Sequence, residues 1–390
     1  MSETPAPLIF LIAGEHSGDA LGAKVIAGLK QATGGHVRIA GIGGPEMAAE
    51  GLQSLFPMRE LAIMGLLEVI PHIPRVLRRI DQTVKAIESM RPDAVLTIDA
   101  PGFCFRVAKK LKGKGIPLVH LVAPTVWAWK PKRAEKISKF LDHLLVILPF
   151  EPPYFTKHGL ATTYVGHPVV ENRAGDGAAF RTRHGIQPQE TVLAVLPGSR
   201  RGEIERLLPP FGAAVARLAG RHPGLRVALP AVDTLRDQIA ETVRGWPVPV
   251  TICDGANEKA DLFAAANLAL SAAGTAVLEL VLAGVPTVAA YKVNPLSYRI
   301  ARRLVSLKRY TLPNILLDGD IVPELIQEDC TADRLEAALE RLLTDATARS
   351  RQVEAGGHLK ELLGGNGPAP SRRIAEKLLA IAGEYAKSRT

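Results

Sequence analysis

Residues 268–279 read LALSAAGTAVLE, a short apolar run, a group of small residues and a second apolar run that ends in Glu279. The first run, Leu268–Ser271, has the length and composition of a buried strand, and Ala272–Thr275 forms a tight turn of small residues. A helix that starts at Ala276 would direct its free N–H groups at an anion bound beyond the end of that strand. This strand, turn and helix predict an α/β sheet of the nucleotide-binding type.

The same alternation of strand, turn and helix recurs along most of the chain. Short β-branched or leucine-rich runs alternate with segments of helical period in the first half, and the pattern restarts in the second half. The expected strands are Leu8–Ala13, Val37–Ile42, Ala94–Ile98, Leu118–Val122, Leu144–Leu148, Thr191–Leu196, Val227–Leu229, Val248–Ile252, Leu268–Ser271 and Thr287–Ala290. Strands separated by helices pair in parallel, so the sequence predicts two Rossmann-like, doubly wound domains.

Length and composition predict where these domains end. A chain of 390 residues exceeds the roughly 250–300 residues at which a single hydrophobic core stops growing. The segment 171–189 is rich in Gly, Ala, Arg and Pro without sustained periodicity, which predicts a linker between domains at 1–170 and 190–366. Residues 367–390 predict a separate helix. The sequence leaves open whether that helix packs on its own domain, on the first domain, or on a second chain in a homodimer.

Charge and cysteine content restrict the partners and the compartment. Lys and Arg outnumber Asp and Glu by 48 to 39, a net charge of +9, which favours nucleotides, phosphates or an anionic lipid surface. No helix-turn-helix, zinc-finger or RNP motif accompanies the charge, so nucleic acid is the weakest candidate. The three cysteines form no CxxC pair, and no apolar run reaches the about 20 residues of a membrane span. We expect a cytoplasmic protein.

A second turn supports an anion site in the second half of the chain. LPGSR at 196–200 follows the first expected strand there, and Gly198 and Ser199 form a turn beside the permanently charged Arg200. With Gly274 and Thr275, these residues predict a diphosphate site. Each feature alone also fits an ordinary turn or helix cap.

Two polar side chains would complete a uridine diphosphate site. Glu279, one turn into its helix, can accept hydrogen bonds from both hydroxyls of a ribose. Asn314, in the LPN motif at 312–314, offers the donor and the acceptor that a uracil edge requires. The alternatives are an acidic first-turn residue for Glu279 and a plain Pro-Asn turn for Asn314.

Together with further motifs, these residues resemble one family, the lipid-A-disaccharide synthases, which are inverting glycosyltransferases of GT-B architecture. The motifs are AGEHSGD at 13–19, GGPEM at 43–47, IDAP at 98–101, PTVWAW at 124–129, LPFE at 148–151, GHP at 166–168, LPGSR at 196–200, GT at 274–275 with Glu279, and LPN at 312–314. The resemblance implies two Rossmann-like domains that face an interdomain cleft. It also implies transfer from UDP-2,3-diacylglucosamine to 2,3-diacylglucosamine 1-phosphate through a β-1′,6 bond, with release of UDP and no cofactor.

Inversion requires a base that removes the proton from the acceptor hydroxyl, and Asp99 is our candidate. It follows the expected strand Ala94–Ile98, and Pro101 disfavours a helical conformation just before it. The competing interpretation is an N-cap for a helix that begins near Phe103. The family usually continues with Asp-Phe-Asn where this chain has residues 102–104, Gly-Phe-Cys, a departure that leaves Asp99 itself intact.

The first turn and several histidines are further candidates in the first half. Glu15 and Ser17 lie on the first strand-to-helix turn and would contact the acceptor, or they simply belong to a turn made by neighbouring glycines. His16 occupies a variable position of the family motif. His120 and His167 are weaker candidates, because a lone histidine near a strand end is more often a hydrogen-bonded core residue.

Both implied substrates carry acyl chains, so we expect peripheral association with the anionic inner-membrane surface. Met64 and Leu67 belong to the segment 64–79, which mixes apolar residues with arginines. Trp127 and Trp129 precede a basic stretch and form a second candidate surface. The alternative for the two tryptophans is an aromatic pair in the core.

Three other functions remain as alternatives. Another UDP-sugar enzyme of the same architecture, such as a glycolipid glycosyltransferase or a UDP-sugar epimerase, would share the donor half. A nicotinamide dehydrogenase is weaker, because no acidic ribose ligand follows the first turn at the expected distance. A non-catalytic lipid or nucleotide carrier would bind without turnover. Asp318 and Asp320 spell the DxD of metal-dependent glycosyltransferases, but they lie in a turn context and we expect no metal.

Overall fold

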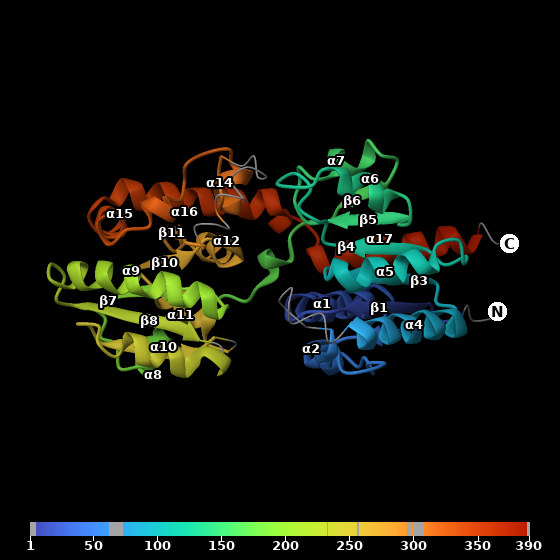
Figure 1. Ribbon diagram of the computed structural model, residues 1–390, viewed down its shortest axis with the longest axis horizontal. Coiled ribbons are helices and arrows are strands. Elements are labelled where there is room, and N and C mark those ends of the chain that lie inside the picture. The colour runs from blue at the N-terminus through green and yellow to red at the C-terminus, as the bar shows by residue number, and fades with distance from the viewer. Residues whose placement is uncertain are drawn as a thin grey trace. The chain divides into compact units, whose positions relative to one another are not determined.

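The computed structural model describes residues 5–61, 73–231, 233–255, 257–294, 298 and 308–387. The chain divides into two compact units (Figure 1). Unit 1 consists of Met1–Glu171 and Leu363–Thr390, and unit 2 consists of Asn172–Leu362. Each unit contains one six-stranded parallel sheet with helices around it, so the expected α/β class with two Rossmann-like sheets is confirmed.

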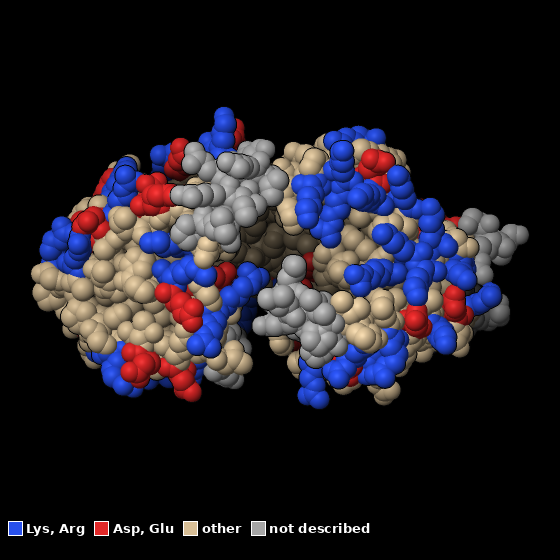
Figure 2. Space-filling model, viewed as in Figure 1, with Lys and Arg blue, Asp and Glu red and all other residues tan. Residues whose placement is uncertain are grey.

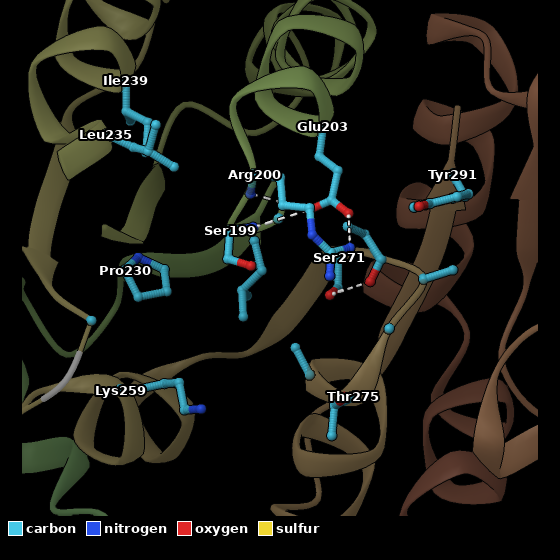
Figure 3. A pocket seen from close by; sticks show the side chains of 17 residues that line it. Ser199, Arg200, Glu203, Pro230, Leu235, Ile239, Lys259, Ser271, Thr275 and Tyr291 are labelled. Atoms are coloured by element: carbon cyan, nitrogen blue, oxygen red, sulfur yellow. Dashed lines mark hydrogen bonds and ion pairs between the residues drawn. The ribbon is translucent and has the colours of Figure 1, made fainter. Parts of the chain in front are cut away.

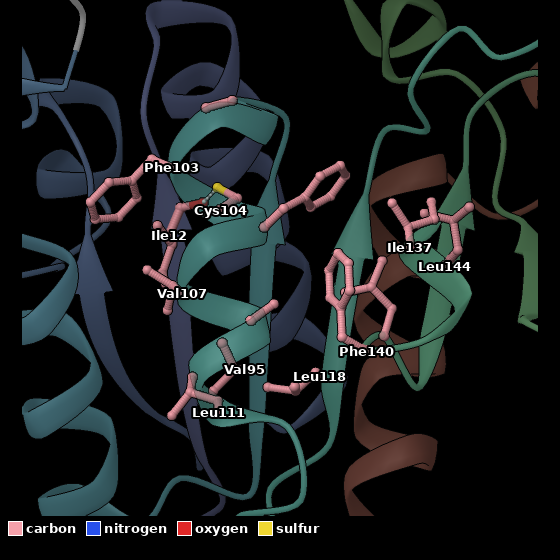
Figure 4. Close-up of a cluster of buried hydrophobic side chains, with 14 of the residues drawn as sticks. Ile12, Val95, Phe103, Cys104, Val107, Leu111, Leu118, Ile137, Phe140 and Leu144 are labelled. Atoms are coloured by element: carbon pink, nitrogen blue, oxygen red, sulfur yellow. Dashed lines mark hydrogen bonds between the residues drawn. The ribbon is translucent and has the colours of Figure 1, made fainter. Parts of the chain in front are cut away.

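The sheet of unit 1 has the strand order β2-β1-β3-β4-β5-β6. Its strands are β1 (Leu8–Ala13), β2 (Arg38–Ile42), β3 (Ala94–Ile98), β4 (Leu118–Leu121), β5 (His143–Val146) and β6 (Ala161–Tyr164). Successive side chains of a strand point to opposite faces, and both faces here are covered. Phe10 and Ile12 therefore enter one core, shown in Figure 4, while Ile9 and Leu11 enter the other.

Helices cover both faces of this sheet (Figure 1). They are α1 (His16–Ala32), α2 (Pro45–Ala49), α4 (Ile73–Met90), α5 (Pro101–Leu111), α6 (Lys132–Ser138), α7 (Pro152–Thr156) and α17 (Pro370–Lys387), with 3₁₀ turns η1 (Met58–Glu60) and η3 (Pro168–Glu171). The C-terminal helix α17 buries Ile374 and Leu378 in the same core as Val25 and Ile26 of α1. The helix expected at 367–390 thus packs on unit 1 of its own chain.

The sheet of unit 2 has the strand order β12-β11-β10-β7-β8-β9. Its strands are β7 (Thr191–Leu196), β8 (Leu225–Ala231), β9 (Val250–Asp254), β10 (Leu268–Ala272), β11 (Thr287–Tyr291) and β12 (Glu324–Ile326). Its helices are α8 (Gly177–Arg183), α9 (Arg201–Ala219), α10 (Arg236–Val243), α11 (Lys259–Ala265), α12 (Thr275–Leu282), α14 (Leu312–Leu316), α15 (Ala332–Thr344) and α16 (Ala346–Lys360). Its 3₁₀ turns are η4 (Asp233–Leu235) and η5 (Gln327–Asp329), and the π-helical turn η6 (Glu361–Gly365) begins in unit 2 and ends in unit 1. The opening stretch 268–279 forms β10 and α12, as predicted.

The segment expected to be a linker, 171–189, is instead largely part of unit 2. It contains α8, whose N-cap Asp176 accepts a hydrogen bond from the Ala179 N–H at 2.8 Å. Phe180 is fully buried against residues of α11, and the Asp176 N–H donates to Asp261 Oδ1 at 2.9 Å. A helix of seven residues is too short to show a helical period, which is why composition suggested a linker.

Within the described ranges, no helix combines the length and the hydropathy that a membrane crossing requires.

Candidate functional site

A pocket of about 410 Å³ opens in unit 2 where the carboxyl ends of the strands meet the helices that follow them (Figure 3). The turns after β7 and β10 form two of its walls, and the ends of β8 and β11 contribute Pro230 and Tyr291. Parallel sheets place their ligands at this edge. Of the predicted donor residues, the pocket brings together Gly198, Ser199, Arg200, Gly274 and Thr275.

The turn after β10 presents the start of α12 to the pocket. Gly274 and Thr275 are both exposed there, and Gly274 is the N-cap residue with extended backbone. In the part of the chain that the structure describes, no side chain caps this helix. The N-terminus of α12 therefore offers N–H groups and a partial positive charge to a ligand.

The turn after β7 has a different arrangement, because Glu203 occupies its donors. The Glu203 carboxylate accepts hydrogen bonds from the N–H groups of Ser199 (3.1 Å) and Arg200 (3.3 Å), and from Arg200 Nη1 (3.3 Å). Gly198 has a φ of 107°, and a Cβ at that position would lie 2.3 Å from Glu203 Oε2, so only glycine fits. The Arg200 side chain remains 66% exposed and can reach beyond this bond.

Glu279 does not line the pocket itself but pairs with a residue that does. Its Oε2 lies 2.8 Å from Nζ of Lys259, the first residue of α11. Lys259 is a pocket residue that the sequence analysis did not identify. Nothing in its local sequence marks it, because the contact joins two helices 20 residues apart.

The prediction that Asn314 binds a uracil edge is wrong. Asn314 is 2% exposed, and its Oδ1 accepts from the N–H groups of Ile321 and Val322, both at 2.9 Å. Its Nδ2 donates to the Val322 carbonyl at 2.8 Å and to Glu324 Oε1 at 2.9 Å. These four bonds use every donor and acceptor of the amide, so Asn314 holds its own loop together.

The two carboxylates of the DxD sequence are engaged by an arginine. Arg309 Nη1 lies 2.5 Å from Asp318 Oδ1, and Arg309 Nε lies 3.2 Å from Asp320 Oδ1. Both acidic side chains are otherwise about 90% exposed, at 92% and 89%. This exposed ion-pair cluster does not resemble a metal centre.

Asp99 in unit 1 lies at the carboxyl end of β3, in a strained backbone conformation. Asp99 and Ala100 have φ angles of 47° and 43°, the left-handed region that non-glycine residues rarely occupy. Burial raises the pKa of the Asp99 carboxyl. The N-cap of α5 is Ala100, so the alternative in which Asp99 caps that helix is excluded. A Cβ on Gly14 would lie 2.8 Å from the Ala100 Cβ, which shows how closely the first turn approaches.

Asp19, a residue that sequence reasoning did not single out, stabilises the first turn through hydrogen bonds. Asp19 is fully buried and accepts hydrogen bonds from the N–H groups of Gly44 (2.7 Å), Glu46 (3.0 Å) and Met47 (3.1 Å). It thus caps α2 and joins the motifs at 13–19 and 43–47. Glu15 is half-buried as the N-cap residue of α1, and His16 and Ser17 are exposed.

Two histidines considered in the sequence are buried core residues. Burial lowers the pKa of His120 to about 3, and its Nδ1 lies 2.7 Å from Thr97 Oγ1. Burial lowers the pKa of His167 to about 4, and its Nδ1 accepts from the Val169 N–H at 3.1 Å. Both rings are neutral near pH 7 and have structural partners.

The two tryptophans have different environments. Trp127 is half-buried, stacks edge to face on Phe150 at 5.3 Å, and its Nε1 donates to Glu151 Oε1 at 3.4 Å. Trp129 is 40% exposed, with Lys130 Nζ 4.1 Å from its ring centroid. Of the pair, Trp129 alone presents an exposed aromatic surface. Burial raises the pKa of Glu151, the last residue of the LPFE motif, to about 7.

Met64 and Leu67 lie outside the described residues. The described remainder of the segment 64–79 belongs to α4, where Ile73 is 40% exposed and Leu77 is 46% exposed. Arg75 and Arg78 are also exposed on this helix. The start of α4 therefore has the expected mixture of apolar and basic residues at its surface.

Comparisons with known proteins are consistent with this geometry. Residues 9–370 match a family model described as lipid-A-disaccharide synthetase. Lipid-A-disaccharide synthase of Rhodospirillum centenum is 54% identical over 378 residues, which cover 96% of this chain and 94% of that protein. The Paramagnetospirillum magneticum protein of the same name is 50% identical over 378 residues, with coverages of 95% and 97%.

Solved structures resemble the chain in fold alone. An S. aureus MnaA–UDP co-structure has a TM-score of 0.65 at 11% identity and covers 98% of this chain and 97% of that one. Acinetobacter baumannii MurG has a TM-score of 0.59 at 14% identity, with coverages of 96% and 99%. At these identities the likeness establishes the two-sheet architecture and nothing about the substrate.

Proposed function

Because the chain belongs to the lipid-A-disaccharide synthase family, we propose that it joins UDP-2,3-diacylglucosamine to 2,3-diacylglucosamine 1-phosphate, with inversion and release of UDP. It is a glycosyltransferase of lipid A biosynthesis. The observation that carries the choice of substrates is the match over nearly the whole length of proteins of that name. The fold, which UDP-sugar epimerases share, does not distinguish these reactions.

The donor diphosphate would bind at the N-terminus of α12, which no side chain caps among the described residues. Gly274 and Thr275 are exposed in the pocket, and helix N-termini stabilise negative charge. The exposed guanidinium of Arg200 lines the same pocket and would stabilise the charge that develops on UDP as the glycosidic bond breaks. Glu279 would accept hydrogen bonds from the ribose hydroxyls. In this proposal the protein supplies the leaving-group stabilisation without a metal.

Asp99 would act as the general base on the acceptor. The 6-hydroxyl must lose its proton as its oxygen attacks the anomeric carbon and the UDP oxygen departs. A carboxylate whose pKa is raised by burial binds that proton more strongly than an exposed aspartate. The left-handed backbone at residues 99–100 supports a functional role, because such strain concentrates at active sites.

We propose that the basic face of unit 1 contacts the membrane that holds the acylated acceptor. Lys and Arg side chains gather over α5 and α6 in Figure 2. The exposed basic residues there are Arg106, Lys109, Lys110, Lys112, Lys114, Lys130, Lys132, Lys136 and Lys139. Three of them pair with acidic neighbours, which leaves an excess of positive charge for an anionic lipid surface.

One assay tests the catalytic proposal. The purified protein is incubated in detergent with both acylated sugars, and disaccharide and UDP are measured for the wild type, Asp99→Asn, Arg200→Ala and the control Asp81→Asn. Asp81 is an exposed carboxylate on α4 of the same unit as Asp99. We expect losses of at least about 100-fold in kcat for Asp99→Asn and normal turnover for Asp81→Asn. A wild type that forms no disaccharide contradicts the proposed reaction, and an active Asp99→Asn contradicts the assignment of the base.

A second assay tests the lipid surface. The protein is sedimented with vesicles of phosphatidylglycerol or phosphatidylcholine, beside a Lys132→Glu/Lys136→Glu variant and the control Lys360→Glu on α16. We expect binding to the anionic vesicles that the double variant loses and the control keeps. Equal binding of all three proteins contradicts the placement on this face.

A further inference from the structure

We propose that Lys259 binds the phosphate groups of the donor nucleotide, while its partner Glu279 binds the ribose. The proposal rests on the proposed function, since it assumes that the unit 2 pocket holds a UDP-sugar. It adds a phosphate-binding residue to a pocket in which sequence motifs indicated Arg200, the turn at Gly198 and Ser199, and the start of the helix after Thr275.

The first observation is that the N-terminus of α9 at the pocket is already occupied. The Glu203 carboxylate accepts from the N–H groups of Ser199 and Arg200 at the start of α9 and also contacts the Arg200 guanidinium. A phosphate at that place would meet a carboxylate on the same donors, and like charges in contact repel. The diphosphate therefore favours the opposite wall, where α12 begins at Thr275 without a capping side chain among the described residues.

The second observation is the position of Lys259 on that wall. In Figure 3 its side chain extends from the start of α11 toward the first turn of α12, where Thr275 lies. The side chain is 38% exposed and lines the pocket. An ammonium group has three donors, and the hydrogen bond to Glu279 Oε2 uses one of them. The remaining donors can reach a ligand held by α12.

The third observation is that Glu279 keeps this cation in place. The Glu279 carboxylate is 18% exposed, and its negative charge compensates the cost of holding the ammonium at a partly buried site. With Oε2 engaged by Lys259, Oε1 would be the carboxylate oxygen that accepts a hydrogen bond from a ribose hydroxyl. Lys259 and Glu279 would thus bind different parts of the nucleotide. Phosphate oxygens require donors, which Lys259 supplies, and sugar hydroxyls can donate to the Glu279 carboxylate.

The alternative is a positioning role, in which Lys259 orients Glu279 and never contacts the ligand. The two roles differ in their dependence on phosphate. A lysine that binds phosphate contributes to UDP affinity and not to uridine affinity. A lysine that only positions Glu279 contributes equally to both, since both ligands carry the ribose.

The test is calorimetric titration of the full-length protein with UDP and, separately, with uridine. The variants are Lys259→Gln, which removes the charge, and Lys259→Arg, which keeps it. Lys360→Gln is the matched control, an exposed lysine of unit 2 outside the pocket. Thermal unfolding of each variant verifies that it is folded.

For Lys259→Gln we expect UDP affinity to fall about tenfold or more and uridine affinity to change less than about twofold. Lys259→Arg and Lys360→Gln should bind UDP within about threefold of the wild type. Equal losses for UDP and uridine, or no loss for UDP, overturn the role of Lys259 while leaving the proposed function standing. A wild type that binds no UDP overturns the proposed function, and this inference with it.

Discussion

Replacing Asn314 by alanine should destabilise unit 2 and leave its affinity for UDP unchanged. The amide makes four hydrogen bonds inside the protein, to the backbone of residues 321–322 and to Glu324. A neutral bond contributes about 1 kcal/mol net, and a buried group left without its partner costs about 1–3 kcal/mol. Alanine removes all four bonds at a position that is 2% exposed, so we expect a loss of about 3 kcal/mol in the free energy of unfolding.

Urea unfolding and UDP titration of the same Asn314→Ala preparation measure the two quantities. Gln187→Ala serves as the control, because Gln187 carries an exposed amide in the same unit. We expect the midpoint in urea to fall for Asn314→Ala alone, with the UDP dissociation constant of the folded protein unchanged. A variant of normal stability that loses UDP affinity more than about tenfold would refute the structural role and restore the uracil contact suggested by the sequence.

Three further predictions concern unit 1. Because the pKa of Asp99 is raised, the loss of activity on acidification should begin at a higher pH than it would with an exposed aspartate as base. A pH profile of kcat/KM whose acidic limb has the pKa of an ordinary carboxyl contradicts this. Gly14→Ala should lower kcat about tenfold or more by pressing on the Ala100 Cβ, and the double variant Gly14→Ala/Ala100→Gly should recover much of it; failure of the rescue refutes the steric cause. Burial raises the pKa of Glu151 from 4.5 to about 7, so between these pH values the folded state binds a proton that the unfolded state does not. The free energy of unfolding should therefore decline by about 3 kcal/mol as the pH rises from 4.5 to 7. Urea unfolding of Glu151→Gln should lack this decline.

Most strands that sequence reasoning identified are buried along nearly their whole length, and a strand covered on both faces has a composition that stands out locally. The edge strands β2 and β9 are only partly buried, but each coincides with an expected run rich in β-branched residues. The two missed strands are β6 (Ala161–Tyr164) and β12 (Glu324–Ile326), at the edges of their sheets. They are short, and most of their residues are only half-buried, so no hydrophobic run marks them.

The candidate site could be predicted where chemistry follows from local backbone. Gly274 and Arg200 were identified because turns after strands have a recognisable composition, and both line the pocket. The environment of Asn314, in contrast, depends on a loop that folds back from residues 321–324. Lys259 and Glu279 meet across two helices. Such pairings depend on tertiary packing, which local pattern does not encode.

The carboxyl edge of the unit 1 sheet shows how the fold maintains a strained active-site candidate. Asp99, Ala100 and Val122 all have positive φ angles, and left-handed residues of this kind cost about 1–3 kcal/mol each. The Asp99 N–H donates to the Leu121 carbonyl at 3.0 Å, and the Val122 N–H donates to the Leu145 carbonyl at 3.1 Å. Asp99 and Val122 thus continue the hydrogen bonding of their strands toward the neighbouring strand. These bonds of the sheet offset part of the strain and fix the backbone of Asp99 at the edge where parallel sheets bind their ligands.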